Sequence, residues 1–317
     1  MALHQASGRW RLGLLLALVT AGCWATLPVA LKITLEQLDP LTLTWFRFLI
    51  AALVMLAWIA ARQGFSAFAN LDRKRWLYLS AAAALLIGNY VFYLLGVQQT
   101  SPGNAQLIIQ LAPLLMALGG IFIFRESYRP GQWLGLAIIA AGLGLFFNDQ
   151  VTHSTLGAGR YVWGSALVAL AAVVWAGYAL LQKQLLVRLG SPLILFFIYA
   201  VASLALLPLS QPSRLLSLDT QGWWLLGYCV VNTLVAYGAF AEALVHWQAS
   251  RVSAILATTP LLSLGVIALV HGIWPSLIAP EQVSWLGYAG ALLVVAGSAM
   301  ASLLGQRDPA PDITEPP

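Results

Sequence analysis

The sequence has few charged residues: Asp, Glu, Lys and Arg make up 9% of its 317 residues, whereas hydrophobic residues make up 60%. Soluble domains carry about 25% charged residues, so this composition excludes an ordinary soluble domain. Apolar stretches of about 20 residues follow one another along almost the whole chain, which predicts a polytopic helical membrane protein. The net charge of +5 does not indicate nucleic-acid binding, because the basic residues lie in short loops and form no basic face.

Groups that support catalysis or metal binding are also scarce. The two cysteines, Cys23 and Cys229, lie inside apolar segments and have neither a disulfide framework nor metal-ligand spacing. All six Asp residues lie in loops or in the tail, and no predicted span holds a Ser–His or Asp–Asp pair. An intramembrane enzyme would need a nucleophile with its base, or metal ligands, inside the spans. We therefore expect no catalytic residue, no metal site and no cofactor.

What the chain does have is a duplication with an offset of roughly 150 residues. The recurring residues are, in order, Trp24, Pro40, Pro113, Gly135 and Gly142 in the first copy, and Trp175, Pro192, Pro260, Gly290 and Gly297 in the second. The last two glycines have the same spacing in both copies. Internal repeats of apolar helices are typical of many secondary transporters.

Hydropathy predicts an all-α integral membrane fold with ten spans. The expected spans are 12–33, 41–61, 76–97, 104–124, 131–147, 161–182, 192–209, 222–244, 252–271 and 284–304. We assign residues 1–150 to a first repeat of helices one to five and residues 151–305 to a second repeat of helices six to ten. Residues 306–317 are polar and proline-rich, which predicts a disordered cytoplasmic tail.

The distribution of Lys and Arg predicts the orientation. With the N-terminus in the cytoplasm, the cytoplasmic segments hold twelve of these residues and the outer segments three. This positive-inside bias places both termini in the cytoplasm. Because each copy has an odd number of helices, the second copy must start from the opposite side, and the chain is expected to form two inverted five-helix repeats. Inverted repeats offer a route to alternating access, since either half can adopt either packing arrangement.

Short motifs also follow one another in a fixed order. They are Trp45-Phe46-Arg47-Phe48, Thr100-Ser101-Pro102-Gly103-Asn104-Ala105, Pro113, Glu126, Gly135 and Gly142 in the first copy, and Ala249-Ser250-Arg251-Val252-Ser253-Ala254, Pro260, Gly290 and Gly297 in the second. Over nearly the whole chain, this series resembles the drug/metabolite transporter superfamily, specifically its ten-helix members with two EamA domains. The resemblance implies a central cavity lined by helices one, three, four, six, eight and nine, and transport of small metabolites, often outward. It does not identify the substrate.

The link between helices nine and ten departs from this pattern. Glu126 closely follows helix four, whereas the second copy continues from His271 through Trp274 and Pro275 with an insertion of about eight residues before Gly290. We therefore expect Glu126 to have no counterpart, and the resemblance supports no gating role for this link.

Polar and aromatic side chains near the middle of the spans are the candidate substrate-binding residues, because such groups usually face the bundle interior or a wet cavity. They are Trp24, Asn89, Tyr90, Tyr93, Gln106, Gln110, Trp175, Asn232, Tyr237 and Thr258. The alternative is that the tryptophans pack the repeats together and that the amides form interhelical hydrogen bonds, worth about 0.6 kcal/mol each. Pro113 and Pro260 each remove a backbone donor, which predicts either a hinge with a gating role or a static kink.

Three ionisable residues lie within spans or near their ends. Lys32 is expected to extend to the outer surface. Arg47 is assigned a structural role, with backbone carbonyls or a lipid headgroup as its partner. Glu242 lies four residues before His246, which suggests an interfacial ion pair. The alternative for Glu242 is a protonatable gate that couples transport to the proton gradient.

Together these features predict an inner-membrane secondary transporter that exports small amphipathic or aromatic metabolites, amino-acid-like or drug-like. The scarcity of basic residues near the midplane argues against phosphorylated substrates, which need Lys or Arg to balance their charge. An importer or exchanger of another small metabolite, and a flippase for lipid-linked substrates, remain open alternatives. The expected partners are a small-molecule substrate and the lipid bilayer, with no nucleic acid. A monomer is possible, and the oligomeric state is left open.

Overall fold

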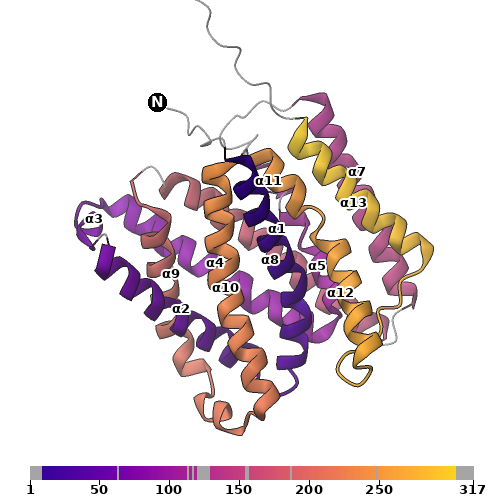
Figure 1. Cartoon of the computed structure of the whole chain (residues 1–317), viewed down its shortest axis with the longest axis horizontal. Coiled ribbons are helices and arrows are strands. Elements are labelled where there is room, and N and C mark those ends of the chain that lie inside the picture. Colours follow the sequence, from indigo (N-terminus) through magenta and orange to yellow (C-terminus); the bar gives the residue numbers. More distant parts are fainter. Residues whose placement is uncertain are drawn as a thin grey trace, which may run out of the picture.

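The computed structural model describes residues 9–62, 64–112, 114–115, 118–119, 129–153, 157–185, 188–247 and 249–304. Within these ranges the chain forms helices and no strands (Figure 1). The long helices are α1 (Trp10–Thr34), α2 (Pro40–Arg62), α4 (Arg73–Gln99), α7 (Pro130–His153), α8 (Ala158–Leu185), α9 (Ser191–Leu206), α10 (Thr220–His246), α12 (Thr259–Ile273) and α13 (Trp285–Leu303). The shorter ones are α3 (Ser66–Ala69), α5 (Pro102–Ile108), η1 (Leu207–Leu209), η2 (Pro212–Ser217) and α11 (Ala249–Leu256).

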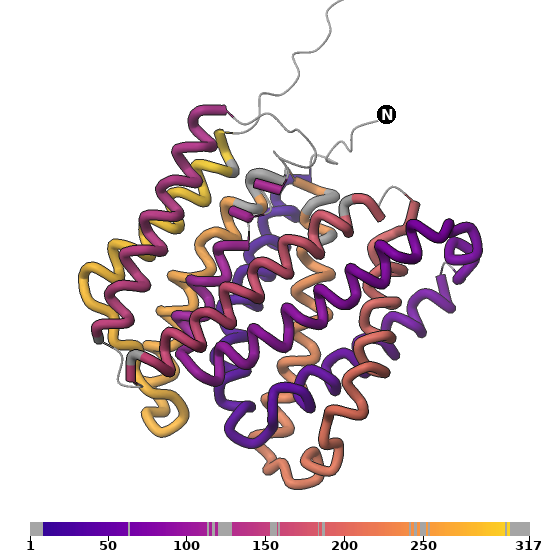
Figure 2. Tube along the Cα trace, turned by 180° about the vertical axis from the view of Figure 1, so that it is seen from behind, coloured from indigo at the N-terminus to yellow at the C-terminus, as the bar shows by residue number. Residues whose placement is uncertain are grey.

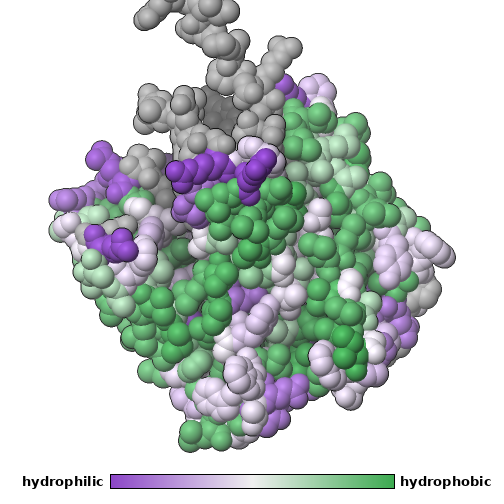
Figure 3. Space-filling model, viewed as in Figure 1, coloured by the Kyte–Doolittle hydropathy of each residue, from purple (hydrophilic) through white to green (hydrophobic). Residues whose placement is uncertain are grey.

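The helices match the predicted membrane spans. In the described part of the chain, eight helical segments are long and apolar enough to cross a membrane, and α13 contributes a shorter apolar segment, Trp285–Ala301. The remaining predicted span, 104–124, begins within α5 and runs into residues outside the described ranges. On the face that Figure 3 shows, a broad apolar surface covers the middle of the bundle, and hydrophilic residues gather toward its ends. The all-α integral membrane fold predicted from hydropathy is confirmed.

Short polar side chains define where several helices begin. Asp39 accepts a hydrogen bond from the backbone N–H of Thr42 at 2.9 Å, and Asp219 accepts one from Gly222 at 2.6 Å. Such caps satisfy backbone donors that have no partner within the helix. Each of these aspartates stands between two apolar stretches, so the sequence ends one span and starts the next at the same point.

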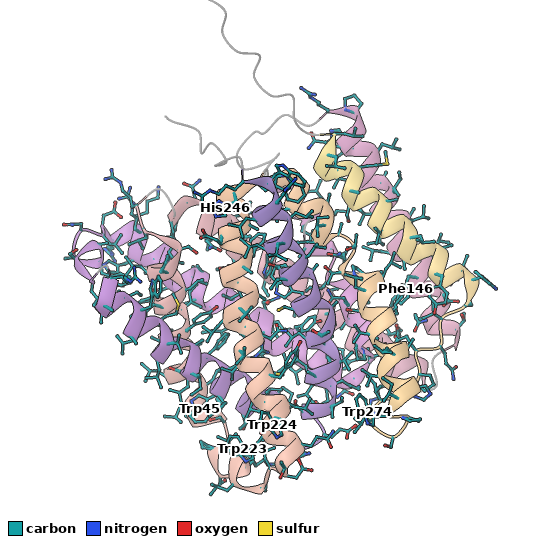
Figure 4. All side chains as sticks on the ribbon, in the orientation of Figure 1. Trp45, Phe146, Trp223, Trp224, His246 and Trp274 are labelled. Carbon is teal, nitrogen blue, oxygen red and sulfur yellow. The ribbon has the colours of Figure 1, made fainter. Side chains whose placement is uncertain are left out.

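Aromatic residues mark one end of the bundle. Figure 4 places Trp45, Trp223, Trp224 and Trp274 at this end and His246 at the opposite end. Trp223, Trp224 and Trp274 expose 44%, 77% and 54% of their surface, as expected for side chains in an aromatic belt at a membrane interface.

The helix pairs in the bundle have the symmetry expected from the duplicated sequence. The four main pairs are α7 with α13, α4 with α8, α1 with α10, and α2 with α9. Exchanging the two repeats converts the α4–α8 pair into the α10–α1 pair and maps each of the other two pairs onto itself. The start of α1 and the end of α13 lie on the same side of the bundle, as an even number of spans requires (Figures 1 and 2). The prediction of two inverted repeats is therefore confirmed.

The repeated glycines form the contact between α7 and α13, which we term the glycine seam (Gly135, Gly142, Gly290 and Gly297). A Cβ atom added to Gly142 would lie 2.6 Å from the carbonyl oxygen of Gly290, and one added to Gly135 would lie 2.7 Å from that of Gly297. The first glycine of one copy thus meets the second glycine of the other, so the two helices are antiparallel. Backbones approach this closely only where small residues face each other.

Helices four and nine are both interrupted near their middle. The first turns at Ile109 and Gln110 after α5, and the second turns at Ala257 and Thr258 between α11 and α12. The predicted span 252–271, for which Pro260 predicts a hinge or a kink, is divided into α11 and α12, and Pro260 stands at the start of α12, where its missing N–H is tolerated. Pro113 lies outside the described residues. Paired breaks of this kind are typical of transporter helices that form a binding site.

Candidate functional site

The structure brings five of the predicted site residues together in what we term the central cluster (Trp24, Tyr90, Tyr93, Gln106 and Tyr237). The rings of Trp24 and Tyr237 have centroids 5.9 Å apart, and the hydroxyl of Tyr90 donates to that of Tyr237 at 3.5 Å. Tyr93 shares a face of α4 with Tyr90 and donates to Oε1 of Gln106 at 3.4 Å. The cluster therefore joins α1, α4 and α5 of the first repeat to α10 of the second.

Arg47 lies beside this cluster although it was assigned a structural role. Its side chain is only 2% exposed, and its guanidinium carbon lies 5.2 Å from the centre of the Tyr90 ring. Nη2 and Nε donate to the hydroxyl of Thr233 at 2.8 and 3.2 Å. Phe48, the next residue on α2, packs between the rings of Tyr90 and Tyr199, at centroid distances of 4.6 and 5.4 Å.

Sequence reasoning missed two neighbours of Arg47. Thr233 gives no signal of its own, because threonines are common in spanning helices and this one is 186 positions away in the chain. Tyr199 could have been found from the repeat, since it follows Pro192 by as many residues as Arg47 follows Pro40.

Asn89 and Asn232 connect the two repeats. Asn89 donates to the carbonyl oxygen of Ala171 at 2.9 Å, and Asn232 donates to that of Cys23 at 2.7 Å. The first bond links helix three to helix six and the second links helix eight to helix one, so each is the counterpart of the other. This placement fits the alternative interpretation of these amides as interhelical hydrogen bonds, and a role in substrate binding stays a prediction.

The other candidates lie around the breaks or outside the cluster. Gln110 stands at the turn of helix four, and the hydroxyl of Thr258 donates to the carbonyl of Ile255 at 2.7 Å at the turn of helix nine. Trp175 is not the mirror image of Trp24, because it contacts Tyr178 of its own helix at a centroid distance of 6.5 Å. Its role in binding also stays a prediction.

Glu242 lies near the end of α10 in the geometry of an interfacial pair. Its carboxylate is 3.1 Å from Nε2 of His246, and 57% of its side-chain surface is exposed. This placement favours the ion-pair interpretation over a gate in the transport pathway.

At the opposite end of the bundle, Lys32 binds the end of helix three. Its Nζ donates to the carbonyl oxygens of Val97, Gln98 and Thr100 at 2.8, 3.0 and 2.6 Å. The expectation that Lys32 extends to the outer surface was wrong, because these three carbonyls have no partner within α4 and satisfy the ammonium group inside the protein.

Glu281, from the link between α12 and α13, binds the start of helix four. It accepts hydrogen bonds from the hydroxyl of Ser101 and from the backbone N–H groups of Gly103 and Asn104. A Cβ atom on Gly103 would lie 2.8 Å from the Glu281 carboxylate, so a larger residue there would have to displace the carboxylate. Burial raises the pKa of Glu281 above its ordinary value, and the hydrogen bonds from Ser101 and the backbone oppose this shift.

Lys32, Ser101 and Glu281 together form what we term the Lys32–Glu281 clamp, which also corrects the analysis of the repeat. Glu281 precedes Gly290 by as many residues as Glu126 precedes Gly135, so the expectation that Glu126 has no counterpart was wrong. Glu126 itself lies outside the described residues. An insertion at the start of the link hides this correspondence when residues are counted from the end of helix nine.

Two inverted helical repeats, two interrupted helices and a polar aromatic cluster between them define the class of multi-pass membrane transporters. The model of the EamA-like transporter family matches residues 11–148 and 162–303, and the chain belongs to this family. It is a multi-pass inner-membrane protein. Membership of a transporter family is compatible with the expectation that the chain is not an enzyme.

Several relatives have similar length. The chain is 40% identical over 297 residues to the uncharacterized inner membrane transporter YhbE of Escherichia coli K12, spanning 93% of this chain and 92% of that protein. It is 23% identical over 295 residues to a probable amino-acid metabolite efflux pump of Salmonella typhimurium, spanning 89% and 92%. A solved crystal structure shares the fold with a TM-score of 0.63 at 22% identity, covering 93% of this chain and 98% of that chain.

Proposed function

We propose that this transporter exports small amphipathic or aromatic metabolites across the inner membrane by alternating access. The central cluster carries this proposal, because it places aromatic rings and hydrogen-bonding groups at the meeting of both repeats. Aromatic rings bind apolar or cationic groups, and the phenols and Gln106 supply polar contacts that fix a ligand's orientation. The relative described as a probable amino-acid metabolite efflux pump supports both the direction and the size of the substrate.

The Lys32–Glu281 clamp supports the alternating part of the proposal. Lys32 from α1 holds the last carbonyls of α4, and Glu281 holds the first backbone donors of α5. The clamp thus ties helices one, three and four and the link between helices nine and ten together at one end. Access to the central cluster from this end requires the clamp to open. We assign this end to the periplasm and the termini to the cytoplasm, because Lys and Arg concentrate at the opposite end.

The first test is export. A strain that overproduces the protein should grow on otherwise inhibitory concentrations of some members of a panel of amino acids, toxic amino-acid analogues and aromatic cations. Everted vesicles from this strain should accumulate the same compounds, whereas an importer would deplete them. Protection against no compound, together with no counterflow in proteoliposomes, would contradict the proposal.

A matched pair of variants tests the site. Trp24→Ala removes a ring of the central cluster, and Trp163→Ala removes a lipid-facing ring that is 63% exposed. Aromatic contacts contribute about 0.5–1.5 kcal/mol each, so Trp24→Ala should raise the KM for counterflow by about 2-fold to 10-fold. Trp163→Ala should leave it unchanged. Equal effects of the two variants on KM would contradict the assignment of the central cluster to the binding site.

A further inference from the structure

Arg47 is the basic residue that the fold places at the centre of the bundle. Every other Lys and Arg in the described residues lies at a helix end or in a link. Arg47 instead lies on α2 beside Tyr90, and only 2% of its surface is exposed. A buried guanidinium is costly unless its charge is balanced and its donors are bonded.

The hydrogen bonds between Arg47 and the described residues leave one edge of the guanidinium without a partner among them. A guanidinium has five N–H donors, and the bonds to Thr233 occupy one on Nε and one on Nη2. No hydrogen bond to a described residue accounts for the two donors of Nη1 or for the second donor of Nη2. Nη1 and Nη2 together form the edge that binds both oxygens of a carboxylate.

Thr233 fixes this arrangement. Its hydroxyl donates to the carbonyl oxygen of Cys229 at 2.8 Å, so its lone pairs are directed toward Arg47. The threonine therefore orients the guanidinium without neutralising it. The ring face of Tyr90 adds a cation–π contact.

No described acidic residue balances the charge. The described acidic residues are Glu36, Asp39, Asp72, Asp149, Asp219, Glu242 and Glu281. Each lies in the terminal turns of a helix or in a link, and none of them forms an ion pair with Arg47. Three described tyrosines lie near Arg47 instead: Tyr90, Tyr93 and Tyr199.

We propose that Arg47 binds the carboxylate of the transported substrate, with its Nη1–Nη2 edge, and that the central cluster holds the rest of the molecule. This inference rests on the proposed function and names its substrate class: small monocarboxylates with an aromatic or apolar body, amino acids included. From Arg47 a path of contacts leads through Tyr90 and Tyr237 to Trp24, where the rings are 5.9 Å apart. A substrate whose apolar part lies along this path would place its carboxylate at the guanidinium of Arg47.

The charge count also distinguishes a carboxylate from a phosphate. One guanidinium neutralises one carboxylate, whereas a phosphate ester carries about −1.5 to −2 at neutral pH and needs further cations. The described residues of the cluster supply none. We therefore retain the expectation that phosphorylated metabolites are not substrates, with Arg47 now part of the binding site.

The test compares acids with the amines that lack the carboxylate. Counterflow in proteoliposomes of the full-length protein would be measured with phenylalanine, tryptophan and leucine, and with phenethylamine, tryptamine and isoamylamine. The wild type should transport acids in preference to amines. Arg47→Met should lower acid transport by at least about tenfold, the order expected for loss of a charged hydrogen bond. Arg47→Lys keeps the positive charge but loses the paired donors, so its rate of acid transport should lie between those of the wild type and Arg47→Met.

Two further measurements separate recognition from misfolding. Thr233→Val keeps the charge and removes the orienting hydroxyl, so it should raise the KM for acids and leave any amine transport unchanged. The melting temperature of purified Arg47→Met without ligand should be no lower than that of the wild type, while the acids that stabilise the wild type should no longer stabilise the variant.

Three results would overturn the inference. They are amines transported as well as acids by the wild type, an acid preference retained by Arg47→Met, and transport of none of the six compounds. Transport of amines alone would leave the protein an exporter of amphipathic metabolites, so it would contradict this inference without contradicting the proposed function.

Discussion

The glycine seam and the centre of the bundle use the duplicated sequence in opposite ways. In the seam, both copies contribute the same two glycines to a symmetric contact: Gly142 lies against Gly290, and Gly135 lies against Gly297. In the centre, Arg47 of α2 corresponds to Tyr199 of α9, so a cation in one copy stands where a phenol stands in the other. Symmetry is kept where the two copies only have to fit each other. It is lost where a polar ligand has to be held in one orientation.

The seam gives the largest expected effect. Gly142→Val and Gly290→Val should each lower the free energy of unfolding by about 3 kcal/mol, because both place a side chain against the facing backbone. Gly144→Val is the matched control on the same helix, where a Cβ atom meets nothing within 4 Å. Unfolding in mixed micelles measures the cost of each substitution. Gly297→Val, at the position that corresponds to Gly142 in the repeat, should cost as much as Gly142→Val, and unequal costs at these two positions would break the symmetry of the seam.

The partly buried Lys32 and the buried Arg47 should respond differently when their charge is removed. Lys32→Met leaves three carbonyls of α4 without their donor and should cost about 2 kcal/mol of stability. Arg47→Met replaces a buried charge that has no described acidic partner, so stability should stay the same or rise. Thermal unfolding of both variants without ligand checks this. A destabilised Arg47→Met would return Arg47 to a structural role.

Glu281 should make stability depend on pH. Its folded-state pKa is raised by burial, so its protonated form favours the folded protein and this contribution is lost as pH rises through the raised pKa. An unfolded glutamate titrates near pH 4.3, so the decline should begin at about this pH. The melting temperature of the wild type should therefore fall with rising pH above this point, and that of Glu281→Gln should fall less. If the melting temperatures of the two proteins changed with pH in parallel, Glu281 would not be the source of the pH dependence.

The smallest effect is expected at Glu242. Its pair with His246 is exposed, and exposed pairs contribute about 0–1 kcal/mol. Glu242→Gln should therefore transport with the same pH dependence as the wild type. A changed pH profile would make Glu242 the protonatable gate that the sequence left as an alternative, and would place functional asymmetry at this end of the bundle as well as in the centre.

The spans, the inverted repeat and much of the central cluster could be predicted from the sequence. Each depends on a feature that can be counted along the chain. The length of the apolar stretches predicts the spans, the constant offset predicts the repeat, and the depth within a span predicts Trp24, Tyr90, Tyr93 and Tyr237. Depth is enough to find residues near the midplane, because polar groups there are few.

The neighbours of Arg47 and the clamp could not be predicted in this way. Arg47 and Thr233 meet because α2 and α10 are rotated to face each other, and rotation is decided by packing across the whole bundle. The sequence predicts that Lys32 is an interfacial residue, because the carbonyls that it binds belong to another part of the chain and their proximity cannot be seen in the sequence. The correspondence of Glu281 with Glu126 was available in the sequence, but only when counted from the glycines.

The glycine seam has one more consequence. A contact in which each patch binds its own copy is isologous, the kind that joins two identical subunits across a two-fold axis. Nothing in the contacts of Gly135, Gly142, Gly290 and Gly297 depends on the two helices being parts of one chain. The same surface would join two separate five-helix proteins inserted in opposite directions, so the seam has the form of an ancestral homodimer interface kept inside a fused chain.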